Sequence, residues 1–512
     1  MAFKRALAAA LAAAVCLSLT GCVRAPYAPE TETEIVLPEP SQEPASMILG
    51  ETMDVPPVSV TLYYVAADGT SFSTVTRSIA VSEGENICEE AVNALLRSGS
   101  SPDRMDVIPS GTQLLGVEYA CGIATVNLSL DALDVQSEQE HMMMLASIGN
   151  TLLSIEGVEG VNVLIDGRSI AVAGLPTGIQ TEMYSSITSA YAQISAEREY
   201  FIESQTGAIE RTAALYFPAS AGNGLMPELR TVSFDSSDYA SGLIRALCEG
   251  PLSTPGATTA IPDGADFLLE NPAIEISPAG ERVLRLDFSS TLRNYLAFSG
   301  LEEWQLIGSV VLTICSFAPE IDAVSIRIGN EEVLGCAVGE SQIEFEGGTI
   351  RRSDFASSIS SAVALYLPHA DGTFERVERA VSMVRAASPL SVLYALFDGI
   401  LAQNNSASVF PTGVYYDDIL GVSVSDGIAS VNLSANFYRQ AQALDATAER
   451  GVVYAIVNTL CELEGIAGVR FYIEGISAQT LSGSIYLRSV LLPNPGLVSP
   501  EPSAVPEITA TP

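Results

Sequence analysis

The stretch Val126-Asn127-Leu128-Ser129 occurs again in this chain as Leu286-Asp287-Phe288-Ser289 and as Val431-Asn432-Leu433-Ser434. Apolar and polar residues alternate in each copy, which is the pattern of a half-buried β-strand. The copies lie roughly 150 residues apart, a period typical of tandem domains rather than of solenoid repeats. A chain of 512 residues is also long for a single core, and it predicts about three domains joined by linkers.

Two further strands precede this stretch in every copy. The first strand is apolar and carries a Leu-Tyr pair, at Leu62-Tyr63, Leu215-Tyr216 and Leu365-Tyr366. A pair of residues that tolerate the positive φ angles of tight hairpin turns follows each strand. These pairs are Asp68-Gly69, Asn223-Gly224 and Asp371-Gly372. A second strand should therefore return antiparallel to the first.

Two helices are predicted in each copy from apolar residues spaced three and four apart. The first helix should end at a glycine, which can adopt the left-handed conformation of a helix C-terminus. These glycines are Gly99, Gly250 and Gly399. A Pro-Gly turn then leads into the next strand, as Ile108-Pro109-Ser110-Gly111-Thr112, Ile261-Pro262-Asp263-Gly264-Ala265 and Phe410-Pro411-Thr412-Gly413-Val414. The second helix carries Asn150-Thr151-Leu152, Leu312-Thr313-Ile314 or Asn458-Thr459-Leu460.

A final strand pair begins at Val161, Val324 and Val469, so the elements follow the order ββαββαββ. We therefore predict an α+β fold with three tandem modules, each a mixed sheet with two helices. The modules are predicted at residues 57–176, 212–338 and 361–490. Residues 177–211, which have helical spacing, and 339–360 are predicted linkers.

The first 21 residues have the features of an export signal. Lys4 and Arg5 form a basic head, and the apolar stretch from Ala6 to Leu19 is too short to span a bilayer comfortably. Leu19-Thr20-Gly21-Cys22 resembles a bacterial lipobox, whose cysteine becomes the lipidated first residue of the mature chain. An ordinary cleaved signal with a chance cysteine is the alternative. We expect acyl chains such as palmitate on Cys22 to hold the protein at the outer face of the cell membrane.

The two ends of the mature chain are predicted to be extended. Residues 22–56 are acidic and rich in proline, and they are interpreted as a tether that lifts the modules off the membrane. Residues 491–512 are also rich in proline and are predicted to be a disordered tail. No segment after the signal offers a transmembrane helix.

The charge balance bears on the partners of this protein. The formal net charge is -37, from 24 Lys and Arg against 61 Asp and Glu, so phosphate backbones should be repelled by most of the surface. Nucleic acid is therefore not an expected partner. Solvated acidic faces explain such a balance without any special role.

Six cysteines remain beyond Cys16 and Cys22, and none forms a CxxC pair. They are Cys88, Cys121, Cys248, Cys315, Cys336 and Cys461. Most lie in apolar runs, where buried free thiols are commoner than disulfides or metal ligands. Only His141 and His369 are available to a zinc site. We predict no metal and no cofactor.

Motifs of known catalytic sites are missing from the sequence: there is no Gly-x-Ser-x-Gly, no phosphate-binding loop with lysine and no His-Glu-x-x-His. The acidic pairs Glu89-Glu90, Glu302-Glu303 and Asp417-Asp418 are adjacent, and adjacent residues do not share a face of a helix or strand. We interpret these pairs as solvated surface and predict no catalytic residue. A glycosidase that uses carboxylates from distant segments stays open.

Several other residues have a structural interpretation. Asn127, Asp287 and Asn432 stand at strand ends, where such side chains commonly organise the turn into the next helix. Trp304, the single tryptophan, lies among apolar helical residues. We therefore favour core packing over an interface anchor for Trp304.

The Ala-Leu-x-x-Gly helix end, the Ile-Pro-x-Gly-Thr turn, the Val-Asn-Leu-Ser strand end and the Asn-Thr-Leu helix resemble the GerM domain, and the resemblance covers each module almost end to end. Copy two departs from it, with Asp287 for the strand asparagine, Leu312 for the helix asparagine and an extra stretch at 271–280. GerM domains occur in envelope lipoproteins, including sporulation and germination proteins, and are similar to ring-building modules of the channel between mother cell and forespore.

The resemblance implies a non-enzymatic envelope scaffold or protein-interaction module in sporulation or germination. Its partners would be envelope proteins or further copies of itself, paired through faces or sheet edges. A lipoprotein that binds a cell-wall polymer or a small ligand is the alternative, and a concave pocket lined by tyrosine would favour it.

Overall fold

A computed structural model describes residues 58–79, 86–97, 101–220, 224–261, 268–269, 272–339, 341–382, 389–398, 409–425, 427–463 and 465–498. The predicted signal 1–21, the lipidation site Cys22, the tether 22–56 and residues 499–512 lie outside the described residues. So do Gly99 and Gly399 at the predicted helix ends, and Asn223, Pro262, Asp263 and Gly264 in the predicted turns.

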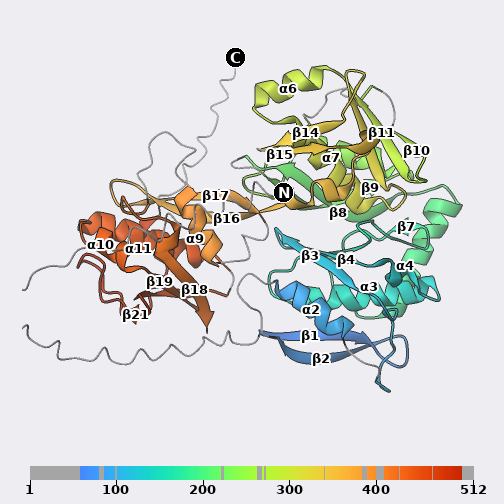
Figure 1. The fold of residues 1–512 in the computed structure, drawn as a ribbon. Coiled ribbons are helices and arrows are strands. Elements are labelled where there is room, and N and C mark those ends of the chain that lie inside the picture. The colour runs from blue at the N-terminus through green and yellow to red at the C-terminus, as the bar shows by residue number, and fades with distance from the viewer. Residues whose placement is uncertain are drawn as a thin grey trace, which may run out of the picture. The chain divides into compact units, whose positions relative to one another are not determined.

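The first module begins with an antiparallel hairpin that precedes its helices and main sheet (Figure 1). Its elements are β1 (Val58–Val65), β2 (Phe72–Ile79), α2 (Ile87–Leu96), β3 (Leu114–Ala120), β4 (Ile123–Leu128), α3 (Glu138–Leu153), β5 (Gly160–Ile165), β6 (Ala171–Val172) and β7 (Leu175–Pro176). The hairpin turns at Asp68, whose carboxylate accepts hydrogen bonds from the amides of Thr70 and Ser71. Helix α4 (Ile187–Arg198) follows within residues 177–211.

The second module repeats this order with additions. Its elements are β8 (Ile209–Pro218), β9 (Leu225–Phe234), α5 (Tyr239–Cys248), β10 (Ala273–Ile276), β11 (Arg282–Phe288), α6 (Thr291–Ser299), α7 (Glu303–Phe317), β12 (Ala323–Ile328), β13 (Glu331–Glu332), β14 (Gly335–Val338) and β15 (Ser341–Glu344). Gly250 follows α5 with φ +78°, so the predicted glycine stop is confirmed at this helix.

The third module repeats the order of the first with one added helix, α10, so modules 2 and 3 each have three helices in the described residues rather than the two predicted. Its elements are β16 (Ser360–Pro368), β17 (Phe374–Ser382), α9 (Pro389–Asp398), β18 (Ile419–Ser425), β19 (Ile428–Leu433), α10 (Ala435–Ala441), α11 (Ala446–Leu460), β20 (Gly468–Ile473) and β21 (Ile476–Ser477). The predicted α+β class with three repeated modules is confirmed.

The first two strands of each module form a hairpin that is separate from a mixed main sheet, rather than one mixed sheet as expected from the sequence. Modules 1 and 2 each have one further two-stranded sheet, β6-β7 and β14-β15. Strands β1 and β2 pair only with each other, whereas β3, β4 and β5 form the main sheet. Strand β3 runs antiparallel to β4, and β4 runs parallel to β5. Helix α3 contacts both β1 and β5, so helices lie between the hairpin and the main sheet. The same layering holds for β8, α7 and β12 in module 2 and for β16, α11 and β20 in module 3.

A segment that follows each module closes one edge of its main sheet. Gln180, Ile350 and Leu491 form antiparallel bridges with Val161, Val324 and Val469, respectively. Each bridge has two backbone hydrogen bonds of 2.8 or 2.9 Å. Gln180 and Ile350 thus lie in the predicted linkers but pair with a sheet.

Residues 491–498 were expected to be part of a disordered tail, and that expectation is wrong for them. Leu491 pairs with Val469, and Val498 forms a parallel bridge with Phe374 of β17. Pro495, one of the prolines that suggested a tail, begins a short 3₁₀ turn, Pro495–Leu497.

The second helix of each module supplies the centre of the core. In α7, all thirteen residues from Gln305 to Phe317 are buried. Trp304 is 1% exposed, which confirms its predicted core packing. One hydrophobic cluster contains Ala120 and Ile123 of module 1 together with the core of module 2. The core of module 3 forms a separate cluster.

Two buried glutamates hold loops in modules 2 and 3 by accepting hydrogen bonds from backbone amides. Glu449 of α11, which is 0% exposed, accepts hydrogen bonds from the amides of Leu481, Ser482 and Ser484 at 2.7–2.9 Å and from the Ser482 hydroxyl at 2.9 Å. Glu228 of β9 likewise accepts from the amides of residues 252–254. Burial opposes ionisation of Glu449, but these hydrogen bonds outweigh it and hold its pKa below the ordinary value of 4.5.

A lowered pKa means that the Glu449 carboxylate stabilises the fold above its ordinary pKa and loses that effect as the pH falls through the lowered value. We expect Glu449→Gln to reduce hydrogen-exchange protection of the amides of residues 481–484 at pH 7, by about 1–3 kcal/mol. The difference from the wild type should shrink as the pH falls below 4.5. The exposed Glu182→Gln is the control, and a pH-independent difference would contradict the assignment.

Candidate functional site

The residues that repeat in the three modules are the first candidates for a functional site. The threonine of each second helix accepts a hydrogen bond from the backbone amide of the repeated tyrosine in the first strand. Thr151 binds Tyr63 at 2.9 Å, Thr313 binds Tyr216 at 3.0 Å and Thr459 binds Tyr366 at 3.0 Å. The sequence showed both residues repeating but gave no signal that they meet.

The repeated helix asparagine holds the segment that closes the main sheet. Asn150 donates to the carbonyl of Tyr184 at 2.8 Å and accepts from its amide at 2.9 Å. Asn458 accepts from the amide of Asn494 at 2.9 Å. Leu312 takes this place in module 2, where no such amide bond is available. The asparagines therefore attach the following segment to the module, which is a structural role.

The strand-end asparagines organise a turn, but not the one expected. Asn127 and Asn432 accept hydrogen bonds of 2.8 Å from the amides of Gly167 and Gly475. Both glycines follow the neighbouring parallel strand, β5 or β20, so the prediction of a turn into the next helix is wrong. The parallel pairing of β4 with β5 and of β19 with β20 brings the two strand ends together, and a single sequence does not reveal this pairing.

Asp287, the module 2 counterpart, forms ion pairs instead. Its carboxylate lies 3.2 Å from Arg285 Nε and 3.8 Å from Arg327 Nε. Arg327 is the residue directly opposite Asp287 in the parallel register. A salt bridge across the strands therefore replaces the amide bond of the other modules.

The acidic pairs are not all solvated surface. Asp418 is 7% exposed and accepts hydrogen bonds from the Ser434 hydroxyl, the Asn436 amide and the backbone amide of Tyr415. Burial raises the pKa of Asp418, but these bonds outweigh burial and lower it overall. Glu302 caps α7 and accepts from the Trp304 indole. The surface prediction is therefore wrong for Asp418. Glu302 is exposed like Glu89 and Asp417, although it also caps a helix.

The six cysteines outside the signal and lipobox are free thiols in the structure. Burial raises the pKa of the Cys88 and Cys315 thiols to about 12, so neither is a thiolate near neutral pH. Among the residues that the structure describes, no group of three or more His, Cys, Asp and Glu side chains is arranged to hold a metal ion.

A buried arginine joins modules 1 and 2. The Arg352 guanidinium donates two hydrogen bonds to the Glu118 carboxylate of β3, one of them 2.8 Å long, and a third of 2.9 Å to the Ser316 hydroxyl of α7. Module 1 also caps the end of α7, because Asn162 and Ser169 donate to the carbonyls of residues 316 and 317 at 3.2 and 2.7 Å. Polar contacts and a shared core thus connect these two modules.

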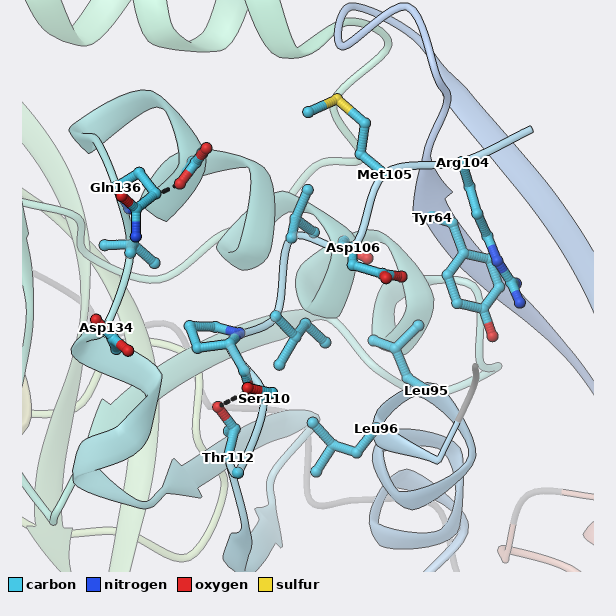
Figure 2. Close-up of a pocket in the computed structure, with 17 residues that line it drawn as sticks. Tyr64, Leu95, Leu96, Arg104, Met105, Asp106, Ser110, Thr112, Asp134 and Gln136 are labelled. Atoms are coloured by element: carbon cyan, nitrogen blue, oxygen red, sulfur yellow. Dashed lines mark hydrogen bonds between the residues drawn. The ribbon is translucent and has the colours of Figure 1, made fainter. Parts of the chain in front are cut away.

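Module 1 contains a concave site lined by apolar, hydroxyl and charged side chains. A cavity of about 540 Å³ lies between the C-terminal end of α2, the segment 104–112, residues 134–136 and α3. Figure 2 shows Arg104 and Tyr64 on one side of it and Asp134 and Gln136 on the other. The Arg104 guanidinium lies 4.1 Å from the centre of the Tyr64 ring, a cation–π contact.

Comparison with known proteins identifies similar sequences and structures. Residues 61–171, 214–334 and 364–479 match the model of the family described as "Germane: Sporulation and spore germination". No curated protein matches the chain.

Two solved structures are similar to parts of the chain. The tandem GerMN domains of the sporulation protein GerM from Bacillus subtilis are 18% identical, over 58% of this chain and 99% of that chain, with a TM-score of 0.22. The first GerMN domain of the same protein is 24% identical, over 28% of this chain and 98% of that chain, with a TM-score of 0.20.

The threonine contact makes a prediction for module 2. Replacing Thr313 by Val leaves the buried Tyr216 amide without its acceptor, so we expect a loss of about 1–3 kcal/mol in unfolding free energy. Urea unfolding followed by the fluorescence of Trp304, which lies on the same helix, measures it. The exposed Thr206→Val serves as the control. Equal stability of the two variants would show that the contact contributes nothing.

The Arg352–Glu118 pair makes a second prediction. Arg352→Met leaves the Glu118 carboxylate, 20% exposed, without its partner, and such a loss typically costs about 3–5 kcal/mol. The double variant Glu118→Gln/Arg352→Met should recover much of that stability, again measured through Trp304. Arg198→Met, which breaks the exposed pair with Glu203, should change little. Additive losses in the double variant would argue against a coupled pair.

Proposed function

The chain belongs to the Germane family of sporulation and spore germination, and from this membership we propose that it is a non-enzymatic, lipid-anchored protein of the cell envelope that acts as a scaffold or protein-interaction module. The observation that carries the proposal is the use of the repeated residues. Thr151 and Asn127 bind backbone groups of their own module, and Asn150 binds the segment that follows it. These repeated residues thus serve the architecture, as expected of a scaffold rather than of a catalytic centre.

Open sheet edges support an interaction role. Within the described residues, the outer strands β3, β10 and β18 each pair with a neighbour on one side only. The opposite edge of each main sheet is closed by the bridges at Gln180, Ile350 and Leu491. An edge strand offers unpaired amides and carbonyls to an added strand. The β10 edge of module 2 and the β18 edge of module 3 are therefore available to a partner or to another copy. Strand β3 of module 1 lies against β16, and the Cys121 amide that follows it donates to the Ser361 hydroxyl.

The exposed edges carry apolar side chains as well. Leu420 in β18 is 46% exposed, and Ile274 and Ile276 in β10 are 47% and 67% exposed. Exposed aliphatic residues on an edge strand favour protein partners, because their burial adds about 25 cal/mol per Å² to strand pairing. The net charge of -37 favours neutral or basic partners over anionic ones.

Membrane attachment through Cys22 is the second part of the proposal. No helix in the described part of the chain is long and apolar enough to cross a bilayer. The lipobox Leu19-Thr20-Gly21-Cys22 supplies an anchor of another kind, because several acyl chains on one terminus bind a membrane stably. Such an anchor would place the modules on the outer face of the cell membrane.

Carboxylate-based hydrolysis is less well supported. A general acid in a glycosidase needs a raised pKa. The buried carboxylates Glu228, Glu449 and Asp418 have lowered pKa values, because their hydrogen bonds outweigh the effect of burial. Burial raises the pKa of Glu320, but Glu320 lies in the turn between α7 and β12, outside the module 1 cavity.

The anchor is tested by metabolic labelling of cells with an alkyne analogue of palmitate. We expect label on the wild type and complete loss of label, with release from the membrane fraction, in Cys22→Ala. Cys121→Ala is the matched control and should stay labelled. Label that persists in Cys22→Ala would refute lipidation at this residue.

The scaffold role is tested by photo-crosslinking in growing and sporulating cells. A photoreactive residue at Leu420 on the β18 edge should give adducts with envelope proteins or with a second copy. The same residue at Tyr200, which is 66% exposed but outside any sheet edge, should not. Adducts only with wall fragments, or equal adducts at both positions, would count against an edge-mediated scaffold.

A further inference from the structure

The module 1 cavity has no part in the proposed scaffold role. Its volume of about 540 Å³ lies in the range of about 300–1,000 Å³ that is typical of small-ligand sites. Leu95, Leu96, Ile108 and Pro109 supply apolar walls, and Ser110 and Thr112 add hydroxyl groups. The cavity therefore combines an apolar body with polar groups, as ligand sites do.

The third module shows that the module fold does not require this opening. Leu96 at the end of α2 corresponds to Phe397 in α9, and Ile108 in the Pro-Gly turn corresponds to Phe410. In module 3 these two rings stack, with centroids 4.1 Å apart, and Tyr416 lies 4.9 Å from Phe397. Aromatic side chains thus occupy the position that smaller aliphatic residues leave open in module 1.

Charged groups of both signs line the cavity. Arg104 stands on one side, held against the Tyr64 ring, while Asp134 stands on the other (Figure 2). Glu140 lies at the same end as Gln136, whose backbone amide donates to the Glu140 carboxylate at 2.7 Å. A carboxylate has more than one lone pair, so Glu140 can still accept from a ligand amine. Asp106 lies between the two sides in the same view.

We propose that the module 1 cavity binds a short zwitterionic peptide. The free amino group would bind at Asp134 and Glu140, the free carboxylate at Arg104, and an apolar side chain would lie against Leu95, Leu96 and Ile108. A zwitterion matches a cavity that carries both signs of charge, whereas a net anion would be repelled by the three carboxylates and by the acidic protein as a whole. The inference does not depend on the scaffold role.

Affinity selection with mass spectrometry tests the proposal on the full-length protein in detergent. The probe is a mixture of tripeptides with apolar central residues, supplied in free, N-acetylated and C-amidated forms. The wild type should retain the free peptides, and capping either end should weaken retention about tenfold, the effect of losing one charge-assisted hydrogen bond.

Four variants assign the contacts. Leu96→Phe/Ile108→Phe, which copies the module 3 filling, should abolish retention, whereas Leu252→Phe at an exposed site of module 2 should not. Asp134→Asn should weaken binding of the free peptides about tenfold. It should leave the binding of the N-acetylated peptides as it is in the wild type, because these peptides have no amino group for Asp134 to bind. Arg104→Gln should show the same pattern with the C-amidated peptides, and Arg198→Gln is its control.

Each outcome bears on the proposal. The proposal is supported if the filled variant loses retention and if Asp134→Asn and Arg104→Gln affect only peptides with a free amino group or a free carboxylate, respectively. No retention by the wild type, equal retention by the filled variant, or indifference to capping overturns it. Asp134 is exposed, so Asp134→Asn keeps the test valid even if the double phenylalanine variant fails to fold.

Discussion

One hydroxyl in each module holds the hairpin to the helix on which the rest of the module is built. Thr151, Thr313 and Thr459 accept the backbone amides of Tyr63, Tyr216 and Tyr366. The same helix contacts the main sheet on its other side, and Asn150 and Asn458 on it hold the closing segments. The layers of hairpin, helix and sheet therefore depend on the position of this helix.

The acidic composition affects the interior as well as the surface. With 61 acidic and 24 basic residues, most carboxylates have no cation available to pair with. Glu449 and Asp418 accept backbone amides and hydroxyls instead, and Glu228 accepts backbone amides in addition to its ion pair with Arg230. These bonds keep the three acids ionised and fix the loops around them. Buried acids in this protein thus organise loops, and their lowered pKa values follow from that role.

The three modules differ in their cores and in the contacts that they make with one another. Module 2 has Leu312 at the asparagine position and shares a core and the buried Arg352–Glu118 pair with module 1. Module 3 has its own core and a stack of aromatic rings where module 1 has a cavity. The same module fold therefore occurs in two forms at this position. Module 1, which is joined to module 2, has an open cavity, and module 3 is filled by aromatic side chains.

The sequence by itself determined the element order, the three modules and the family, because hydrophobic periodicity and turn residues are local signals that repeat. It also predicted core packing of Trp304. The tertiary structure alone decided that β4 and β5 are parallel and that Asn127 serves the turn at Gly167. It also decided that Leu491 pairs with β20 and Val498 with β17. It also decided that Asp418 is buried and that Leu96 and Ile108 border a cavity. These features depend on contacts between residues distant in the chain, which no local pattern encodes.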